Sequence, residues 1–243
     1  MTDFLQTPYV PERQTRLALI GAGSGPFRAF LRRFGVETIV LPPNGASDPA
    51  VQNHADLSVF HAGNGVFFCS EAAAETVKAL QPDKVSVVPV GKLYPDDCAL
   101  NVAWLRKDAF GLGQGSTLPV SSFLQEQGIR FHAVKQGYAN CSVCPAGEKA
   151  LITDDPSICA AAEKAGLAVL LVRKGDVRLP GHAYGFLGGA SAMIGPREVV
   201  FFGDLSTHRD CQAIKSFLNV QNCVCHDLPG VPLTDIGGIV NVK

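Results

Sequence analysis

The sequence is poor in charge and shows no imbalance between the two signs. Charged residues make up 18% of its 243 positions, and 21 lysines and arginines against 22 aspartates and glutamates leave a formal net charge of −1. Such a chain has no basic stripe that could follow a phosphate backbone, which argues against nucleic-acid binding. Hydrophobic residues make up 47%, an ordinary proportion for a globular protein with a substantial core.

Targeting and membrane signals are also missing from the sequence. The N-terminal segment has Asp3 and two prolines where a secretory signal has a basic start and an apolar stretch. No apolar run approaches the roughly 20 residues of a membrane-spanning helix. We therefore expect a cytoplasmic protein with no membrane contact. In that compartment the eight cysteines are expected to be reduced thiols and not a disulfide framework.

The sequence does contain a five-fold repetition of one pattern. An apolar strand opening on polar residues is followed by a second strand, an amphipathic helix and a further apolar strand. The opening strands are predicted to begin near residues 57, 100, 140, 184 and 235, at intervals of roughly 40–50 residues. This spacing is typical of a radial repeat, so we predict an α/β fold of five pseudo-symmetric blades closed into a ring.

The two ends of the chain are predicted to meet in this ring. The last predicted strand, near residues 233–242, has no helix after it, while the first unit lacks a complete opening hairpin. We expect the last strand to return and complete blade 1. Polar, proline-rich and glycine-rich connectors fall between all the units and not at one boundary. The sequence therefore predicts a single domain over residues 1–243.

Three short stretches add a resemblance to a known group of proteins. They are His54-Ala-Asp56, the segment 135–144 (Lys-Gln-Gly-Tyr-Ala-Asn-Cys-Ser-Val-Cys) and the segment 184–191 (Tyr-Gly-Phe-Leu-Gly-Gly-Ala-Ser). With the five-fold pattern, the chain resembles the pentein fold of guanidino-group-modifying enzymes, namely amidinotransferases, arginine and agmatine deiminases and dimethylarginine hydrolases. The three stretches are similar to an uncharacterised bacterial family of that fold. The resemblance implies a bacterial protein with a polar axial pocket.

The resemblance also implies a mechanism, from which this sequence departs. Enzymes of the group use a cysteine nucleophile on the last core strand after a Gly-Gly pair, a histidine as acid and base, and carboxylates that hold the guanidinium. Here the matching stretch contains Gly237 and Gly238, and Asn241 stands where the nucleophile is expected. An amide cannot attack a guanidinium carbon. Covalent catalysis in this chain therefore needs another nucleophile.

The blade openings supply the candidate site residues. A histidine, a thiol and carboxylates in one pocket suit nucleophilic chemistry on a cation. We predict Cys141 as the nucleophile and His54 as the proton carrier, with Asp56 as the third catalytic residue. Asp56 and Asp235 would also hold the cation. The predicted ligand-binding residues are Asp235, Asn140, Asp97, Ser191, Lys135 and Asn241.

The sequence leaves several interpretations of these residues open. The chain is either a hydrolase or amidinotransferase acting on C–N bonds of a small guanidino- or amidino-type metabolite, or a non-catalytic module that binds such a molecule. Buried cysteines are often small apolar core residues, and polar groups at blade openings often cap loops. A third reading is a zinc site made by Cys141 and Cys144 with the Cys223-Val-Cys225-His226 stretch. We assign no metal and no cofactor, and homo-oligomerisation is only a base-rate expectation.

Overall fold

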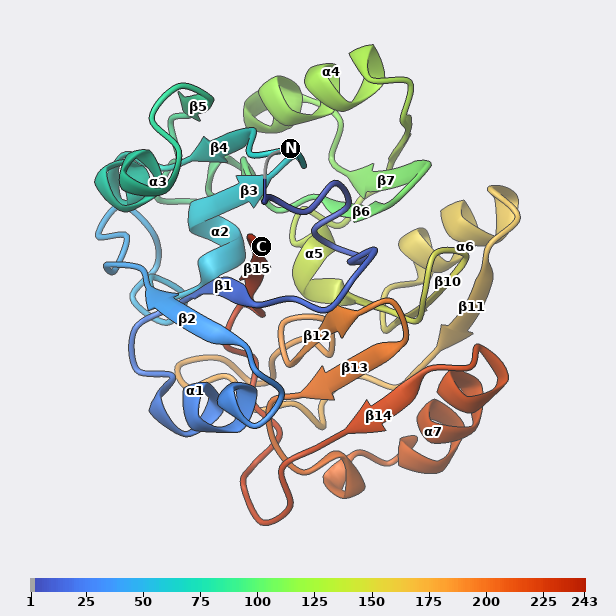
Figure 1. Ribbon diagram of the computed structural model, residues 1–243. Helices are drawn as coiled ribbons and strands as arrows, with labels where there is room; N and C mark the ends of the chain where they lie inside the picture. Colours follow the sequence, from blue (N-terminus) through green and yellow to red (C-terminus); the bar gives the residue numbers. More distant parts are fainter. Residues whose placement is uncertain (1–2) are drawn as a thin grey trace.

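The computed structural model describes residues 3–243 and shows five three-stranded sheets arranged around a common axis (Figure 1). In each sheet the middle strand pairs antiparallel with the strand nearer the axis and parallel with the outer strand. A helix connects the middle strand to the outer one in every blade. The predicted five-bladed α/β ring is confirmed.

The strands group by blade as follows. Blade 1 holds β15 (Val240–Asn241), β1 (Leu17–Ile20) and β2 (Glu37–Val40); blade 2 holds β3 (Val59–His61), β4 (Phe67–Cys69) and β5 (Val85–Val87); blade 3 holds β6 (Ala103–Leu105), β7 (Asp108–Gly111) and β8 (Arg130–Ala133); blade 4 holds β9 (Val143–Pro145), β10 (Ala150–Thr153) and β11 (Ala168–Leu171); blade 5 holds β12 (Ser191–Gly195), β13 (Glu198–Phe201) and β14 (Val224–His226).

The helices fall into two sets. The connecting helices of blades 1 to 5 are α1 (Gly25–Arg32), α3 (Ala74–Leu80), α4 (Leu118–Glu126), α6 (Pro156–Lys164) and α7 (Cys211–Val220). The short helices are α2 (Ala55–Ser58), α5 (Ala139–Ser142), η1 (Glu71–Ala73), η2 (Asp96–Cys98), η3 (Gly115–Thr117) and η4 (Leu205–Thr207). None of the helices in the described part of the chain is long and apolar enough to cross a membrane.

Local sequence signals explain where the connecting helices begin and end. In α6 the Asp155 carboxylate accepts hydrogen bonds from the backbone N–H groups of Ser157 and Ile158, which satisfies two donors at the start of the helix. Pro156 occupies the first helical position, where no N–H partner is needed. Gly166 follows the helix with φ +82°, a conformation that favours glycine.

The chain ends close the ring as predicted. The C-terminal strand β15 pairs antiparallel with β1, in the register Ala18 opposite Asn241 and Leu19 opposite Val240. The extended segment is shorter than the predicted 233–242, because Gly237 and Gly238 both have positive φ and bend the backbone before the strand begins. This bend directs the preceding Asp235 toward the axis region.

The blade openings differ from the prediction in one respect. The strands begin at Val59, Ala103, Val143, Ser191 and Val240, a few residues later than expected. In blades 2 and 4 the residues that open the repeat form one-turn helices, α2 and α5. A segment of four residues is too short to show whether its period is that of a helix or of a strand, so sequence periodicity did not separate them. The helical turns place polar side chains near the axis before each strand begins.

Apolar clusters fill the contacts between neighbouring blades. One cluster joins blades 1 and 2 through Leu19 and Phe67, and another joins blades 1 and 5 through Ile20 and Phe202. The largest cluster links blades 3, 4 and 5. The apolar side chains thus hold the ring together from between the blades. The polar residues of the openings meet near the axis.

Candidate functional site

A cavity of about 420 Å³ is lined by residues from the blade openings. Four of the lining residues are buried and polar or reactive. His54 precedes α2 in blade 2, Asp97 lies in η2 before blade 3, Cys141 lies in α5 of blade 4, and Asp235 precedes β15 of blade 1. The fold therefore gathers four of the predicted site residues around one cavity.

The Cys141 thiol is held by two polar neighbours. Its Sγ donates a hydrogen bond to Oδ2 of Asp56 at 2.9 Å, and Nδ2 of Asn101 donates to the sulfur at 3.4 Å. Burial, together with the negative charges of Asp56 and Asp235, raises the pKa of this thiol well above its usual value. The structure therefore holds Cys141 in its protonated form.

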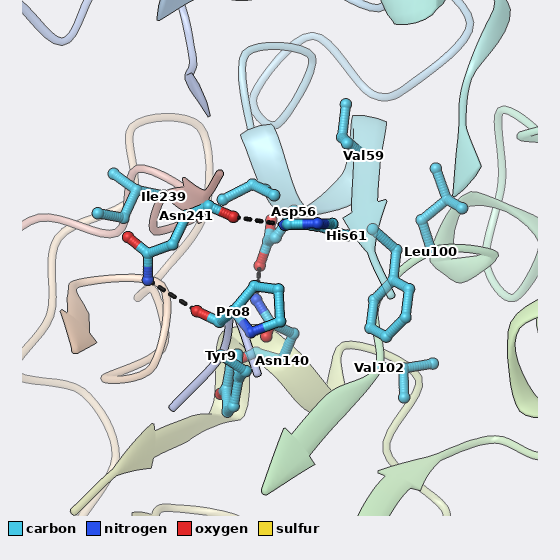
Figure 2. A pocket seen from close by; sticks show the side chains of 12 residues that line it. Pro8, Tyr9, Asp56, Val59, His61, Leu100, Val102, Asn140, Ile239 and Asn241 are labelled. Atoms are coloured by element: carbon cyan, nitrogen blue, oxygen red, sulfur yellow. Dashed lines mark hydrogen bonds between the residues drawn. The ribbon is translucent and has the colours of Figure 1, made fainter. Parts of the chain in front are cut away.

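Asp56 lies behind the thiol and lines a second, smaller cavity of about 30 Å³ (Figure 2). Its Oδ2 also accepts a hydrogen bond of 2.8 Å from Nδ2 of Asn140. Its Oδ1 is buried and has no hydrogen-bond partner. Burial raises the pKa of Asp56, and the neighbouring His54 opposes this effect. Asp56 lines the smaller cavity and Cys141 the larger one, and the hydrogen bond between them places Asp56 to exchange a proton with Cys141.

The His54 ring stands beside both Cys141 and Asp235. Its Nδ1 is 3.8 Å from Oδ1 of Asp235, is buried and makes no hydrogen bond. A ring nitrogen, Sγ of Cys141 and a carboxylate oxygen of Asp235 all lie within 4.8 Å of one another. This is close enough for a thiol and an imidazole to act on one ligand.

These three groups are also the one set in the described part of the chain that could hold a metal ion. The hypothesis of a zinc site made by the cysteine pairs is wrong, because the cysteines of these pairs do not form the set of possible metal ligands. Cys141 points at Asp56 from α5, whereas Cys144 lies on the following strand with its thiol against the Pro145 carbonyl. Cys141 lies in α5 and Cys144 lies in β9, and their side chains point in different directions. The two cysteines therefore do not share a site. All eight cysteines are free thiols.

The Asp235 carboxylate is fixed by backbone groups and by close-packed glycines. It accepts hydrogen bonds from the N–H groups of Phe186 at 2.9 Å and Gly237 at 3.0 Å. A Cβ atom on Gly189 would lie 2.0 Å from Oδ1 of Asp235, and one on Gly185 would lie 2.5 Å from its Cβ. The small residues of the 184–191 stretch therefore make room for this side chain, which is the close approach that the glycines indicate.

Asp97 is held through a residue that the sequence reasoning did not single out. The Tyr138 hydroxyl donates a short hydrogen bond to its Oδ2, and the Cys98 thiol donates to Oδ1 at 3.3 Å. Burial and this hydrogen bond raise the pKa of Tyr138, which keeps the phenol protonated. Tyr138 therefore lines the cavity and orients one of its carboxylates.

Asn101 is the central residue that sequence reasoning missed. Its Oδ1 accepts hydrogen bonds from the backbone N–H groups of Asn140 at 2.8 Å and Cys141 at 3.2 Å, and its Nδ2 reaches the Cys141 sulfur. The side chain is fully buried. A signal was present in the sequence, because an asparagine between Leu100 and Val102 interrupts an apolar run at a blade opening.

Four predicted ligand-binding residues do not line the main cavity: Asn140, Asn241, Ser191 and Lys135. Asn140 lines the smaller cavity, where its amide donates to Asp56. The Asn241 amide donates a hydrogen bond of 2.8 Å to the carbonyl of Pro8 (Figure 2) and another of 2.8 Å to the carbonyl of Met193, so it ties the N-terminal segment and β12 to β15. The buried Ser191 hydroxyl donates to the Gly188 carbonyl. Lys135 is exposed beside a separate groove. Asn241 and Ser191 lie within strands, beyond the turn that faces the cavity.

Residues 24–240 match the model of a family of unknown function, DUF6873. The chain belongs to this family. No curated protein matches its sequence. The family therefore covers almost the whole ring, including every blade opening that contributes to the site.

Solved structures of other proteins share the fold over nearly the full chain. An amidinotransferase from Microseira wollei, SxtG of the saxitoxin biosynthetic pathway, has a TM-score of 0.62 at 10% identity, covering 97% of this chain and 96% of its own. Inosamine-phosphate amidinotransferase from Streptomyces griseus gives 0.60 at 10% identity, with 99% and 96% covered. DDAH from Pseudomonas aeruginosa, solved with citrulline, gives 0.58 at 11% identity, with 90% and 92% covered. The pentein fold is confirmed.

Proposed function

We propose that this protein binds a small guanidino- or amidino-type cation in the larger cavity and that Cys141 attacks its central carbon. The main support is a set of three buried carboxylates: Asp56 is hydrogen-bonded to the Cys141 thiol, while Asp97 and Asp235 line the same cavity as that thiol. Within the described residues, none of the three forms an ion pair with a lysine or arginine, and the one histidine close to them, His54, lies beside Asp235 and near Asp56. Buried negative charge without partners is costly, and a cationic ligand would relieve that cost.

The carboxylates that line the cavity have the geometry to bind a planar cation. Asp97 and Asp235 both line the cavity, one from η2 and one from the segment before β15, and each can accept hydrogen bonds from a guanidinium N–H group. The names of the structural relatives, two amidinotransferases and a DDAH, are consistent with this ligand class. In this proposal Asp235 and Asp97 hold the cation, while Asp56 serves the thiol.

The ligand itself would activate the nucleophile. A positive charge beside Cys141 favours the thiolate and lowers the pKa of the thiol, which the surrounding carboxylates otherwise raise. The thiol proton would pass along the existing 2.9 Å hydrogen bond to Asp56, whose raised pKa makes it a better proton acceptor. Cys141 would therefore react when a cation is bound and stay inert otherwise.

The covalent step would proceed by addition and elimination. The Cys141 sulfur forms a C–S bond to the central carbon, one C–N bond breaks, and the leaving amine takes a proton from protonated His54. Water or an amine then attacks the thiouronium carbon and gives a proton to His54. The C–S bond breaks, and the departing thiolate recovers its proton from Asp56. Water as the second nucleophile gives hydrolysis, and an amine gives amidino transfer.

The test compares a cationic with a neutral alkylating agent, read by mass spectrometry of each cysteine. Iodoacetamide should label the half-exposed Cys159, Cys211 and Cys225 first, because Cys141 is buried and protonated. With 2-chloroacetamidine the order should reverse, and Cys141 should react at least tenfold faster than those three. Equal labelling of all cysteines by the amidine would contradict the proposal.

Binding without turnover is a second candidate, favoured by the raised pKa of Cys141 and by asparagine at position 241. Under this alternative, methylguanidine stabilises the wild type and the Cys141→Ser variant against heat equally, and neither releases ammonia or methylamine. Release of amine by the wild type, absent in Cys141→Ser, would exclude it. The same pair of proteins therefore separates the two candidates.

A further inference from the structure

We infer that the ligand of this cavity carries an uncharged aromatic or long alkyl group on its guanidino or amidino head. The inference rests on the proposed function of the same cavity and adds the substrate class. Four aromatic rings form a continuous series along the lining. The ring centroids are 5.8 Å apart for Tyr94 and Tyr138, 6.2 Å for Tyr138 and Phe186, and 6.3 Å for Phe186 and Tyr184.

This aromatic series joins the buried carboxylates to the outer edge of the cavity. In the middle of the series, the Tyr138 hydroxyl is bonded to Asp97. At its outer ends, Tyr94 is 51% exposed and Tyr184 is 38% exposed. An aromatic face close to a cation attracts it, and the remaining faces offer apolar surface to a substituent. A ligand whose head lies on Asp97 would therefore extend its tail along these rings.

Exposed apolar side chains gather at the edge of the cavity. Leu93 is 75% exposed there, beside Tyr94 and Tyr184. These three are among only nine large hydrophobic residues that are exposed in the described part of the chain. Exposed apolar side chains gathered around a pocket mark a binding surface. An apolar tail would cover them.

The charges at the cavity edge argue against a second charged group on the ligand. Among the described residues, no arginine lines the cavity, and the titratable groups at its edge, Lys92, Asp48 and His182, are exposed to solvent. Exposed charges contribute little to binding because water screens them. The carboxylate of an amino acid, or a second ammonium, would lie against apolar walls without a buried partner. Arginine and agmatine are therefore expected to bind more weakly than an aryl guanidine.

The test is calorimetric titration of the full chain with four probes: methylguanidine, arginine, agmatine and 2-phenylethylguanidine. We expect 2-phenylethylguanidine to bind at least tenfold more tightly than arginine and agmatine. If arginine or agmatine binds as tightly, the inference is overturned while the proposed function stands. If no probe binds, the proposed function fails together with the inference.

Substitutions at the edge test whether the aromatic and aliphatic residues are responsible. The measured quantity is the ratio of the affinities for 2-phenylethylguanidine and methylguanidine. We expect this ratio to fall at least threefold in Leu93→Ser and in Tyr184→Ser. Leu118→Ser removes a leucine that is 48% exposed at the start of α4, away from the cavity, and should leave the ratio unchanged. An unchanged ratio in both edge variants would refute the inference.

Discussion

The Cys141 thiol and the Asp56 carboxylate are 85 positions apart in the chain and are joined by a hydrogen bond of 2.9 Å. They come from the openings of blades 4 and 2, which are not neighbours in the ring. Their contact therefore depends on how the blades pack around the axis. After burial, the charge of Asp56 is the main cause that raises the pKa of Cys141, the one buried thiol that lines the main cavity.

Asp56→Asn should bring the pKa of Cys141 closer to its ordinary range. The substitution removes a negative charge that raises this pKa. We expect the pH midpoint for iodoacetamide labelling of Cys141 to move down and the affinity for methylguanidine to fall. Asp48→Asn removes an exposed carboxylate at the edge of the same cavity and should leave the midpoint nearly unchanged. A midpoint that rises in Asp56→Asn would be inconsistent with the assigned role.

Asn101→Ala should lower the free energy of unfolding by about 2–4 kcal/mol. It leaves the buried N–H groups of Asn140 and Cys141 without an acceptor, and each such loss costs about 1–3 kcal/mol. Chemical denaturation measures the change. Asn219→Ala, at an exposed position in α7, serves as the control and should stay within about 0.5 kcal/mol of the wild type. Equal stability of the two variants would count against the hydrogen bonds described for Asn101.

Gly189→Ala should displace the Asp235 carboxylate, because the new Cβ would lie 2.0 Å from its Oδ1. We expect a loss of stability of about 1–3 kcal/mol, together with at least a tenfold loss of methylguanidine affinity. Thermal unfolding and calorimetric titration measure the two effects. Gly45→Ala adds a Cβ atom with nothing within 4 Å and should change neither quantity. Wild-type affinity in Gly189→Ala would show that Asp235 does not hold the cation.

His61 should make the protein sensitive to mild acid. Burial lowers the pKa of His61 from 6.5 to about 4, while its ring bonds to the Asn241 carbonyl and accepts from the Gly65 N–H group. Between these two pKa values the unfolded chain binds a proton that the folded chain does not. Stability should therefore fall as the pH drops from about 6.5 to about 4, by up to about 1.4 kcal/mol for each pH unit.

Urea denaturation of the wild type and His61→Gln at pH 7 and pH 5 isolates this contribution. The glutamine variant should be less stable at pH 7, but it should lose less stability on acidification. His182→Gln, at an exposed position, should keep the wild-type pH dependence. An unchanged pH dependence in His61→Gln would assign the acid sensitivity to other groups.

Several features of the fold could be predicted because they depend on local patterns. The repeat interval, the cap at Asp155 and the glycine at 166 each depend on residues close together in the chain. The return of the last strand could be predicted because blade 1 lacked a strand. The openings were less predictable, because α2 and α5 are four-residue segments of mixed polar and apolar residues, too short to show a strand or helix period.

The candidate site was predictable in part. His54, Asp97, Cys141 and Asp235 meet in one cavity because each stands at a blade opening, which the repeat identifies. Asn241 was assigned from the expected position of the nucleophile and Ser191 from a blade opening, but both lie in strands, where their side chains bind backbone carbonyls outside the cavity. Asn101 and Tyr138 were missed because their importance depends on partners from other blades.

The sequence by itself determined the number of blades, the closure of the ring by its ends and the residue types at its openings, because spacing and periodicity carry this information locally. Only the tertiary structure decided that Asp56 contacts the Cys141 thiol, that glycines pack against Asp235, and that an aromatic series runs from Asp97 to the edge of the cavity. These contacts join blades distant in the chain, and their geometry is set by how the apolar clusters pack the blades together.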